Sequence, residues 1–189
     1  MNTISKNIIS KKNEAHSLFK KFLFSEAIKS LNYIVSKEGE KDYRVFYLLG
    51  TSHIHEKKLD LAEKNLRISL KLNEKFHDTI YNLGVVLQLK ENYLEAIKVF
   101  QMAFNLHPTN LETINQLAEC NERIKSYDNA KKFYHKALEI EIYNKKASKG
   151  LGRIYLKFGY HKQGLEYVIK SAGLLRFNKN DFKIISWIE

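Results

Sequence analysis

A pattern that recurs every 34 or 35 residues limits the fold more than any other feature of this sequence. One column of the pattern holds only small residues: Ala15, Gly50, Gly84, Ala118 and Gly152. A second small column holds Ala27, Ala62, Ala96, Ala130 and Gly164. A third holds Ser69, Ala103, Ala137 and Ser171. Three positions before each of these stands a large residue: Leu66, Phe100, Tyr134 and Val168. Several columns in phase predict an array of stacked units.

Each unit has the pattern of two helices joined by a short turn. In residues 77–110, apolar residues fall at helical spacing on either side of the polar break at 90–92. The small residues then mark the places where neighbouring helices cross closely. A larger side chain there would overpack the crossing at about 1–3 kcal/mol. A mid-helix glycine costs up to about 1 kcal/mol relative to alanine, so we expect packing to compensate for Gly50, Gly84 and Gly152.

The unit resembles the tetratricopeptide repeat (TPR). The third unit carries the family pattern most fully, in Ile80, Leu83, Gly84, Leu87, Ala96, Phe100, Ala103 and Pro108. Other units depart from it, with Glu14 at an apolar position and His53 and Asn121 at an aromatic one. The resemblance implies an all-α fold, a right-handed α-solenoid of about five units. We place these units at 8–42, 43–76, 77–110, 111–144 and 145–178, after an N-terminal lead at 1–7.

Residues 179–189 do not follow the repeat, and we assign them to a C-terminal cap or tail. The segment KNDFKIISWIE is more apolar than a solvated tail. Two interpretations remain open. It is a cap strand or turn folded against the fifth unit, or the start of a contact with another chain or a downstream domain.

Composition points to a protein of a reducing compartment. Cys120 is the single cysteine, so an internal disulfide is impossible and a thiolate zinc site does not fit. The N-terminus has no apolar core of a secretory signal, and no stretch reaches the roughly 18–20 apolar residues of a membrane span. We therefore expect a cytoplasmic protein without a membrane span.

The net charge of +11 comes mainly from lysine, with only five arginines. Scattered lysine is typical of solvated helix faces, whereas surfaces that bind phosphate groups usually carry arginine forks as well. We therefore do not expect a nucleic-acid partner. RNA binding through the lysine surface is kept as a minor hypothesis, beside the two functions given at the end of this subsection.

The sequence lacks the motifs of a reaction site. It has no HExxH, no phosphate-binding glycine loop and no nucleophile elbow. His53 and His55 stand two apart, which does not place them on one helical face. We predict a non-enzymatic protein with no cofactor and no metal.

The resemblance implies that the first helix of each unit lines a concave groove that holds a peptide. Carried over by register, the candidate lining is Asn13, His16, Arg44, Tyr47, Thr51, Tyr81, Asn82, Val85, Asn115, Gln116, Glu119, Lys149 and Arg153. We expect Tyr47, Tyr81 and Asn82 to be central. Asn13, Asn82 and Gln116 share one column, and carboxamides can both donate to and accept from a peptide backbone.

The charges of the expected groove restrict its partner. The Lys, Asn, Asn, Lys and Arg pattern with which some family members clamp chaperone C-termini is absent from every run of three units, so we predict no chaperone carboxylate clamp. The first and last units are basic and the fourth is acidic, which suits a protein or peptide of mixed charge. Self-association through end units or the tail is a further expectation.

Two functions follow from this reading. The leading one is a TPR interaction scaffold that binds a protein segment in its groove. The alternative is the substrate-binding repeat region of a larger modifying enzyme, of the glycosyltransferase, sulfotransferase or hydroxylase type. The partial carboxamide column and the apolar tail motivate the alternative, because the repeat region of some glycosyltransferases holds substrate chains through such amides.

Overall fold

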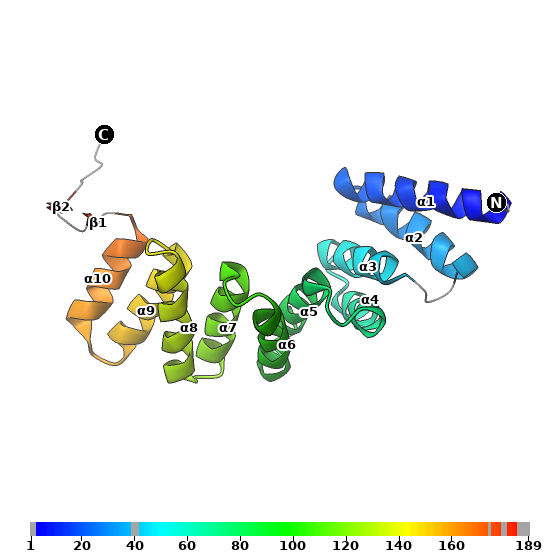
Figure 1. Cartoon of the computed structure of the whole chain (residues 1–189). Coiled ribbons are helices and arrows are strands. Elements are labelled where there is room, and N and C mark those ends of the chain that lie inside the picture. Colours follow the sequence, from blue (N-terminus) through cyan, green and yellow to red (C-terminus); the bar gives the residue numbers. More distant parts are fainter. Residues whose placement is uncertain (1–2, 39–41, 174, 179–180, 185–189) are drawn as a thin grey trace. The chain divides into compact units, whose positions relative to one another are not determined.

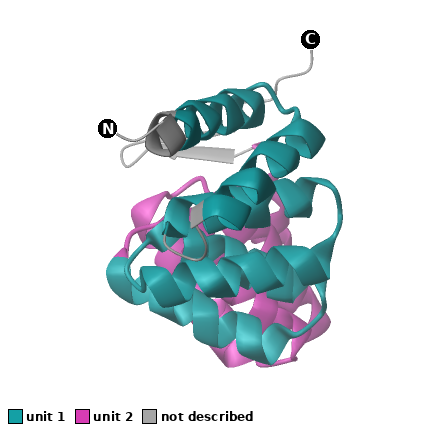
Figure 2. Cartoon of the chain, turned by 90° about the vertical axis from the view of Figure 1, so that its right-hand side faces the viewer, with its two compact units in different colours: residues 1–106 teal, residues 107–189 magenta. Residues whose placement is uncertain are grey.

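Ten helices and two short strands follow one another along residues 3–38, 42–173, 175–178 and 181–184, which the computed structural model describes (Figure 1). They form two compact units, residues 1–106 and 107–189, which Figure 2 colours separately. In both units consecutive helices pack as pairs. The predicted all-α fold of helix–turn–helix units is confirmed.

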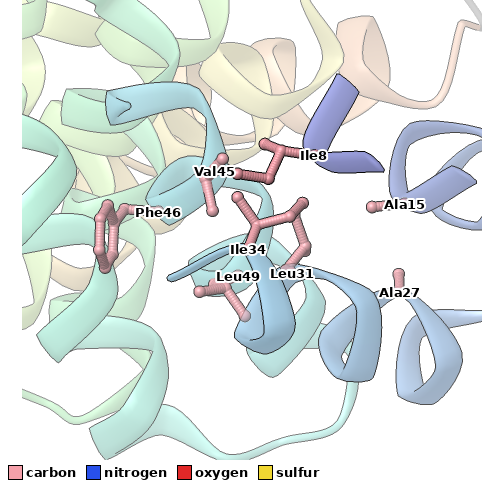
Figure 3. Packing of buried hydrophobic residues seen from close by; sticks show 8 residues of the cluster. All are labelled: Ile8, Ala15, Ala27, Leu31, Ile34, Val45, Phe46 and Leu49. Atoms are coloured by element: carbon pink, nitrogen blue, oxygen red, sulfur yellow. The ribbon is translucent and has the colours of Figure 1, made fainter. Parts of the chain in front are cut away.

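Unit 1 contains three helix pairs. They are α1 (Thr3–Lys20) with α2 (Phe24–Glu38), α3 (Tyr43–His55) with α4 (Leu59–Leu72), and α5 (His77–Leu89) with α6 (Tyr93–Leu106). The first pair closes on apolar side chains from α1, α2 and α3. Figure 3 shows Ile8, Leu31, Ile34 and Val45 gathered between these helices.

Unit 2 contains two helix pairs and a short hairpin. The pairs are α7 (Leu111–Arg123) with α8 (Tyr127–Ile140), and α9 (Lys145–Lys157) with α10 (His161–Ser171). Among its described residues, Tyr134 is the largest fully buried side chain, and Leu117 and Leu151 are buried as well. Strands β1 (Leu175–Asn178) and β2 (Asp181–Ile184) pair antiparallel, with Leu175 opposite Ile184.

The small-residue columns have the packing role that their spacing predicts. A Cβ added to Gly50 would lie 2.6 Å from Leu66 Cγ, and one added to Gly84 would lie 2.6 Å from Phe100 Cε1. Both large residues come from the second helix of the same pair and are fully buried. Backbones that approach this closely leave no room for a side chain, which explains a helical glycine there.

The turn inside every pair has the same backbone. Phe22, Lys57, Glu91 and Lys125 lie at φ values of 58–62°, and Gly159 lies at 81°. The residue after each of them donates its amide to a carbonyl five residues back, as Asn92 does to Leu87 at 2.9 Å. This is the Schellman ending of a helix. Glycine adopts this left-handed backbone at the lowest cost, yet in four of the five turns the residue at this position is not glycine.

At both ends of the array the structure differs from the unit boundaries that the spacing predicted. Helix α1 begins at Thr3, before residue 8, because nothing interrupts the helical run and Ile8 is buried in the core. Residues 175–178, which we assigned to the fifth unit, form β1 instead. Of the apolar tail, Ile185, Trp187 and Ile188 lie outside the described residues.

Candidate functional site

The first helices of neighbouring pairs pack against one another inside each unit. In unit 1, α3 contacts both α1 and α5, and in unit 2, α7 contacts α9. We call the surface that these helices present the first-helix face of each unit. The sequence-predicted groove residues all lie on these five helices.

In unit 1 the structure brings Tyr47 of α3 together with Asn82 of α5. Tyr47 is half-buried, with its ring edge-on to Phe76 at 5.2 Å between centroids. Burial raises the pKa of Tyr47, the nearby Asp78 carboxylate adds to this rise, and a hydrogen bond with Asn82 opposes it. Two polar side chains from adjacent helices therefore share one partly dry site, where a hydrogen bond to a ligand would be strengthened.

Other predicted residues of unit 1 are engaged inside the fold. Thr51 is buried, and its hydroxyl donates to the carbonyl oxygens of Tyr47 (2.9 Å) and Leu48 (3.1 Å) of its own helix. Tyr81 is half-buried, with its ring 5.8 Å from the ring of Phe100. Thr51 therefore has its hydroxyl occupied, and Tyr81 contributes largely to packing.

The remaining unit 1 residues of the predicted lining lie at the surface or near it. Arg44 is exposed, and its Nε donates to the Tyr43 hydroxyl at 3.1 Å. Asn13 and His16 are exposed on α1, and Val85 is half-buried on α5.

In unit 2 the first-helix face contains a pocket of about 490 Å³. Its lining is Leu111, Glu112, Asn115, Glu141, Tyr143, Asn144, Lys145 and Lys146. These residues come from the first turns of α7 and α9 and from the α8–α9 connection. We call it the first-helix pocket. Two carboxylates and two lysines line it, so it offers both charges to a partner.

Two asparagine caps fix the ends of the helices that form this pocket. Asn110 Oδ1 accepts from the Thr113 amide at 2.8 Å, and Asn144 Oδ1 accepts from the Ala147 amide at 2.9 Å. Asn144 also donates its Nδ2 to Glu141 Oε2 at 2.8 Å, which ties the α8–α9 connection to the start of α9. Side-chain caps of this kind satisfy amides that the helix itself leaves open.

Asn115 is the notable residue of the first-helix pocket. Its side chain is only 5% exposed, and its Oδ1 has no hydrogen-bond partner among the described residues. A buried acceptor without a donor costs about 1–3 kcal/mol of stability. A ligand N–H group that enters the pocket would supply the missing donor.

Neighbouring residues of unit 2 differ in how free they are. Gln116 Oε1 is also buried without a partner in the described part of the chain, while Glu119 is half-buried and Lys149 is exposed. Arg153 is already engaged, because its Nε and Nη2 donate to the two oxygens of Glu122 at 3.0 and 2.8 Å. Arg153 therefore braces α9 against α7 and its charge is largely compensated.

The sequence prediction did not include the half of the first-helix pocket that the α8–α9 connection supplies. Glu141, Tyr143 and Asn144 lie between the helices, whereas the register argument considered only first helices. One signal was present, since Asn110 and Asn144 stand 34 residues apart, each just before a first helix.

The described residues contain no group of three or more His, Cys, Asp or Glu side chains placed to hold a metal ion. Burial, with a smaller effect of Glu119, raises the pKa of the Cys120 thiol to about 12, which keeps it protonated and unreactive at neutral pH. None of the described helices is both long and apolar enough to span a lipid bilayer.

Comparisons with known proteins identify the repeat. Residues 111–141 match the family model described as tetratricopeptide repeat. The chain is 29% identical over 149 residues to the BBSome complex member BBS4 of Bos taurus, covering 78% of this chain and 28% of that protein. It is 23% identical over 146 residues to the protein O-mannosyl-transferase Tmtc3 of Drosophila melanogaster, covering 77% of this chain and 15% of that one. The chain thus spans less than a third of these relatives.

Solved structures share the fold. A MamA structure from Desulfovibrio magneticus RS-1 superimposes with a TM-score of 0.83 at 18% identity, covering 88% of this chain and 94% of that one. A second MamA structure gives a TM-score of 0.82 at 17% identity over 89% and 92% of the two chains. Identity this low supports the fold alone.

Proposed function

We propose that this tetratricopeptide repeat protein binds a segment of another protein on its first-helix face and catalyses no reaction on it. The observation that carries the proposal is Asn115, a buried carboxamide whose oxygen lacks a donor in the described residues and which lines the first-helix pocket. A peptide backbone N–H would satisfy that oxygen. The mixed charges of the pocket favour a segment that carries both acidic and basic side chains.

Two further observations support this role. In unit 1, Tyr47 and Asn82 offer a second polar pair on the equivalent helices. The relatives BBS4 and anaphase-promoting complex subunit 3 of Schizosaccharomyces pombe are, by their names, members of multiprotein complexes. We place the proposed binding in the cytoplasm, since the buried free thiol of Cys120 suits a reducing compartment.

A pair of asparagines on α7 allows a sharp test. Peptides that bind the wild-type chain are first selected from a phage-displayed library, and their dissociation constants are then measured by isothermal titration calorimetry. Asn115→Leu should weaken binding about tenfold or more, while the fold keeps or gains stability because an unpaired polar group is removed.

The matched control is Asn121→Leu. Asn121 lies on the same helix and is 4% exposed, but its Nδ2 donates to the Leu117 carbonyl at 2.7 Å. Its replacement should leave peptide affinity unchanged. The proposal is wrong if Asn115→Leu binds the selected peptides as tightly as the wild type does and the Tyr47→Ala/Asn82→Ala double variant does too.

A second candidate function is the substrate-binding repeat region of a larger modifying enzyme. The match to Tmtc3, a protein O-mannosyl-transferase by name, favours it, because this chain covers 15% of that protein. The sequence of the gene after the codon for Glu189 separates the two candidates. A reading frame that continues into a catalytic domain would support the second, and an immediate stop codon would support the first.

A further inference from the structure

We propose that copies of this chain associate head to tail through a second surface of unit 2. A pocket at the turn end of the unit receives the segment Glu139–Tyr143 of a neighbouring copy. The turn-end pocket shares no lining residue with the first-helix pocket, whereas the donated segment includes Glu141 and Tyr143, which also line the first-helix pocket of their own copy.

The receiving site is an aromatic pocket of about 490 Å³, which we call the turn pocket. Its lining is Lys125, Ser126, Tyr127, Asp128, Asn129, Lys131, Ile154, Tyr155, Phe158 and Tyr160. The rings of Tyr127 and Phe158 lie 5.2 Å apart edge to face, and those of Tyr155 and Tyr160 lie 6.1 Å apart. Phe158 is 52% and Tyr160 57% exposed. Four rings that converge on one partly open hollow suit an apolar anchor.

The charge at the turn pocket selects an acidic partner. Lys131 pairs with Asp128 at 2.9 Å, and Lys157 lies 4.6 Å from the centroid of the Tyr127 ring. The ammonium group of Lys125 has no acid partner among the described residues. Three lysines therefore face a single carboxylate, which favours a segment that combines apolar anchors with negative charge.

The same unit exposes a segment with this chemistry. Residues 139–143, at the end of α8 and after it, read Glu-Ile-Glu-Ile-Tyr, and all five are exposed. Ile142 is 56% exposed, and Ile140 is exposed beside it. We call these residues the acidic segment. Exposed isoleucines that alternate with carboxylates complement a hollow of aromatic rings rimmed by lysines.

Geometry assigns the two surfaces to different copies. Tyr127 of the turn pocket begins α8, and Ile140 of the acidic segment ends it. A helix rises about 1.5 Å per residue, so roughly 20 Å separates them and one copy does not fill its own pocket. A contact between two different surfaces is heterologous, and it extends into chains or closes into rings. One pocket and a short segment form a small interface, so we expect a dissociation constant on the order of 10 μM.

Sedimentation velocity of the full chain over roughly 1–300 μM tests the proposal, because this range brackets the expected constant. Wild type should form dimers and larger species as concentration rises. Tyr160→Ala and Ile142→Asp should each weaken association about tenfold or more, since each removes one anchor of the contact. Both residues are exposed, so circular dichroism should be unchanged. Leu94→Asp, at an exposed apolar residue of unit 1, is the control and should associate as wild type does.

Two mixing experiments identify the contact as head to tail. Tyr160→Ala keeps an intact acidic segment and Ile142→Asp keeps an intact turn pocket, so their equimolar mixture should form dimers but no larger species. Lys125→Glu and Glu139→Lys should each weaken association, and the double variant should regain it because the charges are exchanged.

Three results would overturn the proposal. The first is a wild-type chain that stays monomeric throughout the concentration range. The second is association that persists unchanged in both Tyr160→Ala and Ile142→Asp. The third is a peptide of residues 137–145 that shows no binding to the Ile142→Asp chain, whose turn pocket is intact, in a fluorescence-anisotropy titration.

Discussion

Gly150→Ala should destabilise the protein although alanine is the better helix former. The added Cβ would lie 2.2 Å from Tyr134 Cζ and 2.3 Å from its Cε2, whereas ordinary contacts begin at 3.4 Å. The ring would have to move by about an ångström. It is fully buried, and its hydroxyl donates to Glu122 Oε2 at 2.8 Å, so it has little freedom to do so.

The magnitudes of the competing effects decide the sign. Replacing a helical glycine by alanine gains up to about 1 kcal/mol in a helix that can accept the methyl group. Overpacking a closed core costs about 1–3 kcal/mol. Moving the ring would also weaken the hydrogen bond between the Tyr134 hydroxyl and the Glu122 carboxylate, and a hydrogen bond to a charged group contributes about 1.5–3 kcal/mol. We expect a net loss of about 1–3 kcal/mol in the free energy of unfolding.

Urea denaturation followed by circular dichroism measures this loss as a lower midpoint at constant slope. Gly152→Ala is the comparison variant. Its Cβ would meet Val168 Cγ2 at 2.9 Å, on a valine that is 38% exposed and can shift, and the Gly164 carbonyl oxygen at 3.3 Å, so its loss of stability should be smaller than that of Gly150→Ala. In a Tyr134→Ala background, Gly150→Ala should become stabilising. A raised midpoint for Gly150→Ala in the wild-type background would refute the packing argument.

Three further predictions concern ionisable groups. Burial acts to raise the pKa of Glu122, but hydrogen bonds from Arg153 and Tyr134 outweigh it and hold the pKa below its usual value. The stability that ionised Glu122 contributes is therefore present above about pH 4.3 and is lost as the pH falls toward the folded-state pKa. The urea midpoint of the wild type should fall on acidification in this range, and Glu122→Gln should make the midpoint less dependent on pH. Burial lowers the pKa of His53, so acidification below about pH 6.5 should destabilise the wild type more than His53→Leu in thermal melts. With its pKa raised to about 12 by burial, Cys120 should react with iodoacetamide at pH 8 far more slowly in the folded chain than in urea, as mass spectrometry would record.

The site was predictable only in part. The register argument placed Asn115 on a first helix, and the structure sets it at the first-helix pocket. The register argument also predicted Thr51 and Arg153 as groove residues. In the structure the Thr51 hydroxyl donates to a carbonyl of its own helix, and the Arg153 guanidinium donates to Glu122. Spacing tells which face of a helix a residue occupies. It does not tell whether another side chain has already taken its hydrogen bonds.

The sequence by itself determined the helix pairs and the small residues at their crossings. Both follow from a pattern of apolar and small residues that repeats about every 34 residues, because a Gly or Ala that recurs at one position of the repeat indicates close packing of helices there. Tertiary structure alone decided the role of Gly150, which stands outside those columns and yet faces the buried ring of Tyr134. It also decided that the α8–α9 connection completes the first-helix pocket and that Asn115 lacks a donor in the described residues. The physical reason is that hydrogen bonds and overlaps depend on differences of an ångström or less between separate helices, and a one-dimensional pattern does not specify these distances.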